Sequence, residues 1–252
     1  MVMPERSRSS VAECPNAQPE ILHQDDDLLV VFKPPGLPTT SPDAGEPCLV
    51  RWVASQLPRH ATVHATSRLD GPVSGLVTFA LTSRANRHLL EARRAGNYRR
   101  TYLGITTRDV SFTDCEWTWP ISIDPSDRRR RVAGPGKGER EASTRCELAA
   151  RSDSAALLRL MPATGRTHQI RVHASKGGVP LFGDHAYSGD RRVVVQGGSV
   201  VTARRVMLHC ARVRFPQVSG DGLTELTAPL PADMAGVWVE LGGDPDELRV
   251  VD

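Results

Sequence analysis

Three segments of the chain bring together side chains that could do chemistry. They are LLVVFKPPGL at residues 28–37, SRLDGPVSGL at 67–76, and TGRTHQIRVHASKGGVPLFGDHAYSG at 164–189. A carboxylate such as Asp70 can act as a nucleophile or a general base, and a nearby guanidinium such as Arg171 would stabilise its ionised form. Taken singly, each residue also has a structural explanation: the aspartate could belong to a turn, and the arginine to a solvated helix surface.

The order and spacing of these segments resemble the RluA family of RNA pseudouridine synthases. The family's Lys-Pro-x-Gly turn is matched by Lys33-Pro34-Pro35-Gly36, and its Arg-Leu-Asp motif by Arg68-Leu69-Asp70. A family strand with a basic-x-Tyr pattern corresponds to Arg100-Thr101-Tyr102, and the third motif is intact from Thr164 through Tyr187. The resemblance extends from about Ile21 to the end of the chain.

This resemblance implies an α+β fold, with an eight-stranded mixed, mainly antiparallel sheet, few helices and an active-site cleft across its middle. It also implies an isomerase that converts uridine in RNA to pseudouridine without a cofactor or a metal. The family's catalytic aspartate falls on Asp70, its active-site tyrosine on Tyr102, and the arginine that pairs with the aspartate on Arg171. By the same resemblance, Arg68 helps to displace or replace the extruded base.

The chemistry of this reaction agrees with these residue types. The bond between N1 and C1′ breaks, the uracil turns, and C5 takes the place of N1, so the base must first leave the RNA stack. Asp70 would either attack the sugar or abstract a sugar proton, and both alternatives stay open. Tyr102 would offer a ring that stacks on uracil and a hydroxyl near C5. On one helix, the spacing of Thr167 and His168 to Arg171 would turn all three toward the cleft.

Arginine dominates the basic residues, with 29 arginines and three lysines. A planar guanidinium matches phosphate and stacks on bases, so this composition is compatible with an RNA ligand, although a GC-rich genome explains it more simply. We expect RNA contacts from Arg166 and His168 in the third segment. A basic run in a Gly-rich loop should contact RNA phosphates as well, namely Arg128, Arg129, Arg130 and Arg131.

The second segment departs from the family pattern. Ser67 stands where the family usually has His, Phe32 replaces Asn, and Gly71-Pro72-Val73 replaces a more polar stretch. Because the aspartate is kept, these changes affect target choice and loop geometry more than chemistry, and His64 could take over the missing histidine's contact. The alternative function is an RNA-binding protein that keeps the scaffold without activity. A carboxylate-dependent hydrolase fits poorly, because the nearest second acid, Asp184, lies in a Gly-Asp context typical of a turn.

Hydrophobic patterning predicts the elements that position these residues. Strands are expected over residues 21–24, 28–32, 76–82, 98–105, 144–150, 156–162, 205–215 and 236–241. Helices are expected over residues 84–95, with Ser83 as its cap, and over residues 166–176. Residues 123–143 carry charge, Gly and Pro without periodicity, which indicates a mobile loop.

The chain has 252 residues, of which 39% are hydrophobic, and a net charge of +3. This length favours one catalytic domain over residues 21–252, preceded by a flexible tail over residues 1–20. No apolar run approaches the ~18 residues of a membrane span, so we expect a cytoplasmic protein. The five cysteines lack the spacing of a disulfide framework or a zinc site. Ribosomal or transfer RNA is the expected partner, and the protein is expected to be a monomer.

Overall fold

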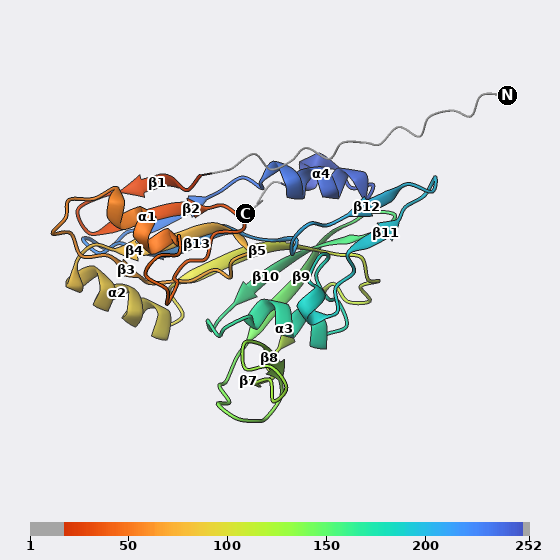
Figure 1. Ribbon diagram of the computed structural model, residues 1–252, viewed down its shortest axis with the longest axis horizontal. Helices are drawn as coiled ribbons and strands as arrows, with labels where there is room; N and C mark the ends of the chain where they lie inside the picture. Colours follow the sequence, from red (N-terminus) through yellow and green to blue (C-terminus); the bar gives the residue numbers. More distant parts are fainter. Residues whose placement is uncertain (1–17, 249–252) are drawn as a thin grey trace.

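A large mixed sheet runs through the middle of the protein (Figure 1). The computed structural model describes residues 18–248. In this part of the chain eight strands form the continuous path of the sheet, in the order β1 (Glu20–Gln24), β2 (Leu28–Lys33), β4 (Ser74–Ala80), β13 (Leu208–Pro216), β5 (Arg99–Thr106), β10 (Ala156–Pro162), β9 (Thr144–Arg151) and β6 (Asp114–Trp117). Off this path, β3 (His64–Ala65) pairs with β4, and β14 (Leu223–Thr227) pairs with β13.

The centre of the sheet is the junction of β4 and β13, which pair in parallel, whereas the other strand pairs described in this sheet are antiparallel. Gly75 of β4 pairs with Cys210 of β13 and has a φ of +120°. A Cβ at this position would lie 2.3 Å from the Cys210 carbonyl oxygen, so only glycine fits. This close approach brings the loop that precedes β4, and with it Asp70, to the middle of the sheet.

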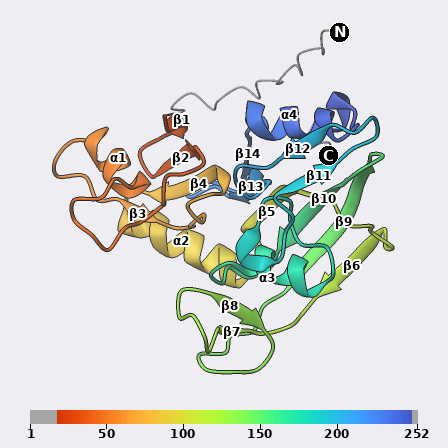
Figure 2. The same cartoon turned by 45° about the vertical axis from the view of Figure 1, so that its right-hand side comes forward.

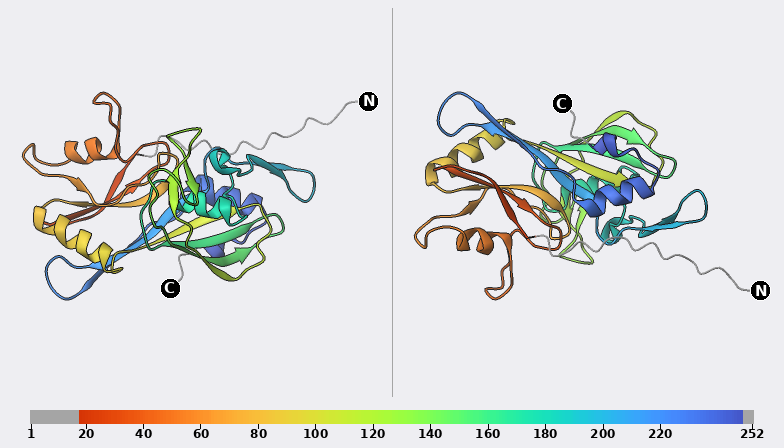
Figure 3. Two further views of the ribbon diagram at one scale, coloured as in Figure 1. Left: turned by 90° about the horizontal axis from the view of Figure 1, so that it is seen from below. Right: turned by 90° about the horizontal axis from the view of Figure 1, so that it is seen from above.

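The helices lie on both faces of the sheet. They are α1 (Leu49–Ser55), α2 (Ser83–Arg94), α3 (Gln169–Lys176) and α4 (Ala232–Glu240), with two short 3-10 helices at His185–Tyr187 and Pro245–Leu248. In Figure 1 α4 lies above the sheet, whereas α2 and α3 lie below it. Figure 3 shows that α2 covers the half that contains β2 and β4, and that α4 covers the opposite face of the other half.

Strand β5 presents different chemistry to the two faces, because successive side chains of a strand point to opposite sides. Leu103 and Ile105 pack with buried residues of α4 in a separate hydrophobic cluster. Arg100 and Tyr102 point to the opposite face, where they line a pocket. The alternation that the sequence shows in this strand therefore separates a core face from a polar one.

Two small hairpins extend the fold, formed by β7 (Ile121–Ile123) with β8 (Arg131–Ala133) and by β11 (Arg192–Val194) with β12 (Val200–Thr202). Figure 2 shows the β7–β8 hairpin beyond the sheet, next to α3. The expectation of a mobile loop over residues 123–143 is therefore wrong for the part that contains β8. The backbone hydrogen bonds between Ile121 and Arg140 order this region further, because they tie the segment after β8 back to β7.

The strands expected over residues 21–24, 28–32, 76–82, 98–105, 144–150, 156–162 and 205–215 are confirmed, with shifts of a few residues at their ends. The helix over residues 84–95 is confirmed as α2, but its cap is Thr82, whose Oγ1 accepts a hydrogen bond from the Ala85 N–H at 3.1 Å. The second helix begins only at Gln169, so Thr167 and His168 precede it.

The strand expected over residues 236–241 is wrong, because these residues belong mostly to α4. Met234, Val237, Trp238 and Leu241 are buried, and their spacing of three and four residues is that of one helix face. The shorter run GVWVEL contains an apparent alternation, and the helical period becomes visible only when Met234 is included.

The proposed tail over residues 1–20 lies outside the described residues up to position 17, and Glu20 already belongs to β1. Within residues 18–248, no helix has the length and the apolar character that crossing a bilayer would require.

Candidate active site

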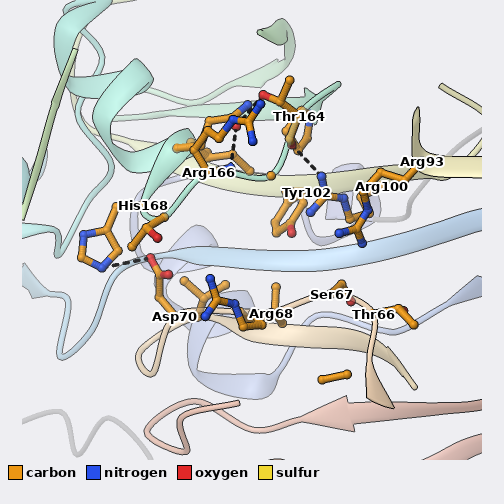
Figure 4. A pocket seen from close by; sticks show the side chains of 18 of the residues that line it. Thr66, Ser67, Arg68, Asp70, Arg93, Arg100, Tyr102, Thr164, Arg166 and His168 are labelled. Atoms are coloured by element: carbon orange, nitrogen blue, oxygen red, sulfur yellow. Dashed lines mark hydrogen bonds and ion pairs between the residues drawn. The ribbon is translucent and has the colours of Figure 1, made fainter. Parts of the chain in front are cut away.

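A pocket of about 380 Å³ opens on the face of the sheet that carries Arg100 and Tyr102. Most of its lining comes from two stretches far apart in the sequence, within residues 65–73 and 162–171, and α2, β5 and Leu208 complete it. The pocket holds the resemblance-derived site residues Asp70, Tyr102, Arg171, Arg68, Arg166 and His168. Figure 4 shows most of these side chains arranged around one space. The structure thus brings together residues that the sequence separates by about one hundred positions.

Arg171 connects two carboxylates at the bottom of this site. Its Nη1 donates a hydrogen bond to Asp70 Oδ2 at 3.1 Å. Its Nε and Nη2 donate to the two oxygens of Asp184 at 2.7 and 2.8 Å. Burial by itself would lower the pKa of the guanidinium, but hydrogen bonds and charge from Asp184 and Asp70 raise this pKa above its ordinary value. Arg171 is therefore a permanent cation that is held from behind by one acid and directed at the other.

His168 adds a second contact to the same aspartate. Its Nε2 lies 3.8 Å from Asp70 Oδ2, and its Nδ1 lies 2.7 Å from the Tyr187 hydroxyl. That hydroxyl accepts a hydrogen bond from the Arg131 N–H, which leaves its own proton for His168. Burial lowers the pKa of His168, against the opposing charge of Asp70. A neutral His168 then carries its proton on Nε2, on the side of the aspartate.

The backbone at His168 is unusual. Its φ of 57° places it in the left-handed region, which residues other than glycine rarely occupy. This conformation lies directly before α3, and it turns the imidazole toward Asp70 and Tyr187. A non-glycine residue held in this region is a strained position of the kind that clusters at functional sites.

The loop that carries Asp70 is held by the Lys-Pro turn at the end of β2. Lys33 is fully buried, and its Nζ donates to the carbonyl oxygens of Pro34, Leu37 and Gly71 at 2.8, 2.7 and 3.1 Å. Burial, with the charge of Arg205, lowers the pKa of Lys33 to about 7. Because one of the three acceptors directly follows Asp70, Lys33 fixes the aspartate through the backbone and not by direct contact.

A second bond pair joins the same two loops. Thr39 Oγ1 donates to the Leu69 carbonyl and accepts from the Leu69 N–H, both at 2.9 Å. The loop after β2 and the loop before β4 are therefore joined on both sides of the aspartate, which explains why the first and second sequence segments occur together.

Tyr102 lies against the pocket from β5 and is 4% exposed. Burial raises the pKa of its phenol, so the hydroxyl keeps its proton at neutral pH. Apolar side chains complete this wall of the pocket, namely Leu69, Val73 and Leu208. The combination of an aromatic ring, apolar surface and a neutral hydroxyl suits a flat, partly polar ring such as a nucleobase.

The expected RNA-binding residues fall into two groups. Arg68 is exposed and lines the pocket, and Arg166 lines it while its Nε donates to the Glu141 carbonyl at 2.8 Å. The run Arg128 to Arg131 lies outside the pocket, on the turn of the β7–β8 hairpin and at the start of β8. Arg130 donates to the Ala186 carbonyl and lies over the Tyr187 ring, so part of this run contacts the residues that support the site.

A family model described as RNA pseudouridylate synthase matches residues 27–176 of this chain. The chain belongs to this family. It is an isomerase, an RNA pseudouridine synthase, with the α+β fold of such enzymes. The matched span includes Asp70, Tyr102 and Arg171, but ends before Asp184. Asp184 and Tyr187 lie beyond this span, within the third sequence segment, and the structure shows their contacts with Arg171 and His168.

Curated relatives cover nearly the whole chain. Ribosomal large subunit pseudouridine synthase D of Vibrio parahaemolyticus is 32% identical over 92% of this chain and 74% of its own length. Ribosomal large subunit pseudouridine synthase C of the same species is 28% identical over 95% of this chain and 74% of its own length. Among solved structures, human RNA pseudouridylate synthase domain containing 4 is similar, with a TM-score of 0.70, 25% identity, and coverage of 88% of this chain and 92% of that one.

Sequence reasoning missed the role of Asp184 in this pseudouridine synthase. Its Gly-Asp context indicates a turn, and the residue does lie in one, but its carboxylate is buried against Arg171. The sequence did contain a chemical signal. A buried arginine requires a buried counter-charge, and Asp184 is the acidic residue that follows α3 in the third segment.

Two further sequence expectations concern the altered second motif. Ser67 lies in the pocket wall, where its Oγ accepts a hydrogen bond from the Thr78 N–H at 3.3 Å. His64 belongs to β3 and does not line the pocket, so it does not replace the missing histidine there.

His173 is buried between Thr144 and the Trp119 carbonyl, and these two hydrogen-bond partners give it a structural role. Over residues 18–248, no cluster of three or more His, Cys, Asp or Glu side chains could hold a metal ion.

Proposed function

We propose that this enzyme converts uridine to pseudouridine in ribosomal RNA, and that Asp70 is its catalytic carboxylate. The observation that carries the proposal is the position of Asp70 in the pocket, with 23% of its side chain exposed and one oxygen held by the buried Arg171. A carboxylate that is both accessible and fixed can meet the sugar of a flipped nucleotide in a defined orientation.

The reaction keeps every atom of the nucleotide except one proton that is exchanged. The N1–C1′ bond breaks, uracil is retained in the pocket, and a new C5–C1′ bond forms. C5 then loses its proton to the solvent and N1 takes up a proton, so the product is an isomer of the substrate. Asp70 attacks C1′ in one version and removes a sugar proton in the other, and in both it needs an unprotonated oxygen. Its Oδ2 accepts the Arg171 hydrogen bond, so Oδ1 is the oxygen proposed to react.

Uracil has to be held while it is detached from the sugar, and the Tyr102 wall is proposed to do this. The ring can stack on the base, and its neutral phenol can hydrogen-bond to it or relay the C5 proton. Because both the tyrosine and its apolar neighbours are deeply buried, they form a rigid surface that does not depend on the RNA for its shape.

Arg171 and His168 are proposed to orient Asp70. Arg171 cannot leave the aspartate easily, since Asp184 holds it by two hydrogen bonds from behind. His168 is restrained by the Tyr187 hydroxyl. These two side chains thus approach Asp70 from the α3 side, and Arg68 and Arg166 at the pocket rim are proposed to meet the RNA around the flipped base.

The choice of ribosomal RNA rests on the relatives, of which several are named as ribosomal large subunit pseudouridine synthases. The direct test is to incubate the purified protein with unmodified transcripts of large-subunit rRNA and of a set of tRNAs, and to map pseudouridine by carbodiimide adducts. We expect one or a few modified positions in the rRNA transcript and none in the tRNAs. Conversion confined to tRNA would overturn the choice of substrate, and RNA binding without any conversion would favour the inactive RNA-binding alternative.

A further inference from the structure

Two arginines lie at the end of the pocket that is farther from Asp70. Arg93 comes from α2 and Arg100 from β5, and both line the pocket. Figure 4 shows them together beyond Tyr102, on the side away from Asp70 and His168. Neither side chain has a role in the proposed isomerisation.

These guanidiniums lack the counter-charges that the buried arginines elsewhere have. Arg171 is paired with Asp184, and Arg205 is paired with Asp233 through two short hydrogen bonds. Among the residues described by the structure, neither Arg93 nor Arg100 forms an ion pair with a carboxylate. Buried cations without an anion are costly, so their presence in a pocket indicates a ligand that supplies the missing charge.

The polar atoms of the pair are also incompletely bonded. Arg100 is 7% exposed and donates from Nη2 to the Thr164 carbonyl at 2.7 Å, while its Nε is buried without a partner. The guanidinium of Arg93 lies 4.9 Å from the centre of the Tyr98 ring, and its Nε and Nη2 are buried without partners. Burial and the charge of Arg100 lower the pKa of Arg93, and this shift is opposed by Tyr98 and Tyr102.

The wall beside Arg100 leaves space for a ligand. Gly165 of the third segment lies next to this guanidinium, and a Cβ added there would be 3.5 Å from Arg100 Nη1 and Nη2. Any other residue at position 165 would place its Cβ against the Arg100 guanidinium. Because Gly165 has no Cβ, this part of the guanidinium is not covered.

We propose that Arg93 and Arg100 form a binding site for one backbone phosphate of the RNA, next to the flipped uridine. The proposal rests on the proposed function, because it assumes that the uridine enters between Asp70 and Tyr102. A phosphodiester carries one negative charge and oxygens that match the fork of a guanidinium, so it would satisfy the unpartnered donors and the excess charge together. Engagement of this phosphate fixes how far the nucleotide enters the pocket, and therefore which sugar atom meets Asp70.

The test compares three small probes, which are uridine, uridine 5′-monophosphate and uridine 3′-monophosphate. Binding is measured by NMR titration with arginine Nε–Hε signals as the readout, on the full chain and on the variants Arg93→Gln and Arg94→Gln. Arg94 is the matched control, since it follows Arg93 on α2, carries the same charge, is exposed and does not line the pocket. Glutamine suits a helix, so both variants should keep α2.

We expect uridine 5′-monophosphate or uridine 3′-monophosphate to bind about tenfold more tightly than uridine, both to the unmodified protein and to Arg94→Gln. In Arg93→Gln most of this gain should be lost, while the affinity for uridine stays level. Equal binding of all three probes would overturn the proposal. An undiminished phosphate gain in Arg93→Gln, or the absence of any arginine signal shift at tens of millimolar of either monophosphate, would overturn it as well.

The experiment is independent of turnover. If none of the RNA transcripts is converted to pseudouridine, the proposed function fails, although the phosphate gain could still be present. If the transcripts are converted but Arg93→Gln binds the monophosphates as the unmodified protein does, only the phosphate site fails.

Discussion

At the residue scale, the site depends on one guanidinium shared by two carboxylates. Arg171 donates three hydrogen bonds, two to Asp184 and one to Asp70. The side chain of Asp184 is 1% exposed and that of Asp70 is 23% exposed, so the two acids have different tasks. The buried acid offsets the cost of burying the arginine, and the accessible one is the carboxylate that we propose to react.

Asp184→Asn should therefore weaken the fold as well as the reaction. The amide keeps the shape but removes the charge behind Arg171, and breaking a buried pair in this way costs about 3 to 5 kcal/mol. Urea denaturation measures this loss. Asp114→Asn is the matched control, because Asp114 pairs with Arg145 at the surface with both side chains about half exposed, where the loss should stay under about 1 kcal/mol. Equal effects of the two substitutions would contradict the role assigned to Asp184.

Lys33 gives the stability of the protein a pH dependence. Its pKa is lowered to about 7 in the folded state, from 10.5 for an ordinary lysine. Between these values the unfolded chain binds a proton that the folded chain does not, so the free energy of unfolding should rise with pH, by up to about 1.4 kcal/mol per pH unit. Below pH 7 both states are protonated and this contribution is flat.

Urea denaturation at several pH values from 7 to above 9 measures the slope. We expect the slope of the free energy of unfolding against pH to be lower in Lys33→Met, because methionine cannot bind a proton. The slope should be unchanged in Lys137→Met, since Lys137 is exposed. If Lys33→Met and the unmodified protein keep the same slope, the lysine is not titrating in this range.

The family resemblance was enough to single out Asp70 and Arg171, because the motifs that carry it are long and specific. Asp184 could not be assigned in the same way. A Gly-Asp pair is typical of a turn, and only the three-dimensional structure shows that this turn places its carboxylate behind α3.

At the scale of elements, the β7–β8 hairpin is connected to the site through Tyr187. The Arg131 N–H of the hairpin donates to the Tyr187 hydroxyl, which contacts His168. Arg130 is used to hold the hairpin, since it bonds to the Ala186 carbonyl. Arg128 and Arg129 are exposed at the turn, and Arg129 also pairs with Asp127 at 3.0 Å, so these two are the members of the basic run proposed to meet RNA.

We expect the double substitution Arg128→Ala with Arg129→Ala to weaken RNA binding without changing turnover at saturating RNA. The logarithm of the binding constant should fall less steeply with salt, by roughly 0.7 to 0.9 for each phosphate that the variant no longer binds. Filter binding of an rRNA transcript at several salt concentrations measures this slope. The matched control is Arg145→Ala with Arg151→Ala, which removes the same charge from side chains of β9 that are also about half exposed. An unchanged slope in the hairpin variant would contradict the proposed phosphate binding.

Among the elements that sequence patterning found, α2 carries a regular period over many residues and β4 is a continuous buried run. Two of its failures have a physical reason. β7 and β8 have three residues each, too few for an alternation to be recognised. In α4 the residues Val237 and Val239 suggest a strand, but Val237 is buried and Val239 is exposed, which is the helical outcome of packing against β5.

At the scale of the whole molecule, the site forms where the two halves of the sheet meet. The parallel junction of β4 and β13 places the Asp70 loop beside β5, and β10 leads directly into the segment that holds Arg166, His168 and Arg171. The eight-stranded path and the central cleft followed from the resemblance in sequence. The parallel junction did not, because it depends on the pairing of residues 75 and 210, which no local pattern records.

The central claim is that Asp70 performs the chemistry, and the most direct measurement is the rate of pseudouridine formation by Asp70→Asn. The amide has nearly the same shape, so the fold, followed by circular dichroism, and RNA binding should be retained. Asn lacks the anionic oxygen of a nucleophile or base, so conversion should fall below detection. Asp190→Asn is the matched control, because Asp190 pairs with Arg108 outside the pocket, and its rate should stay near that of the unmodified protein. If folded Asp70→Asn converts uridine within about tenfold of the unmodified protein, only about 1.4 kcal/mol separates the two barriers, and Asp70 is not the catalytic group.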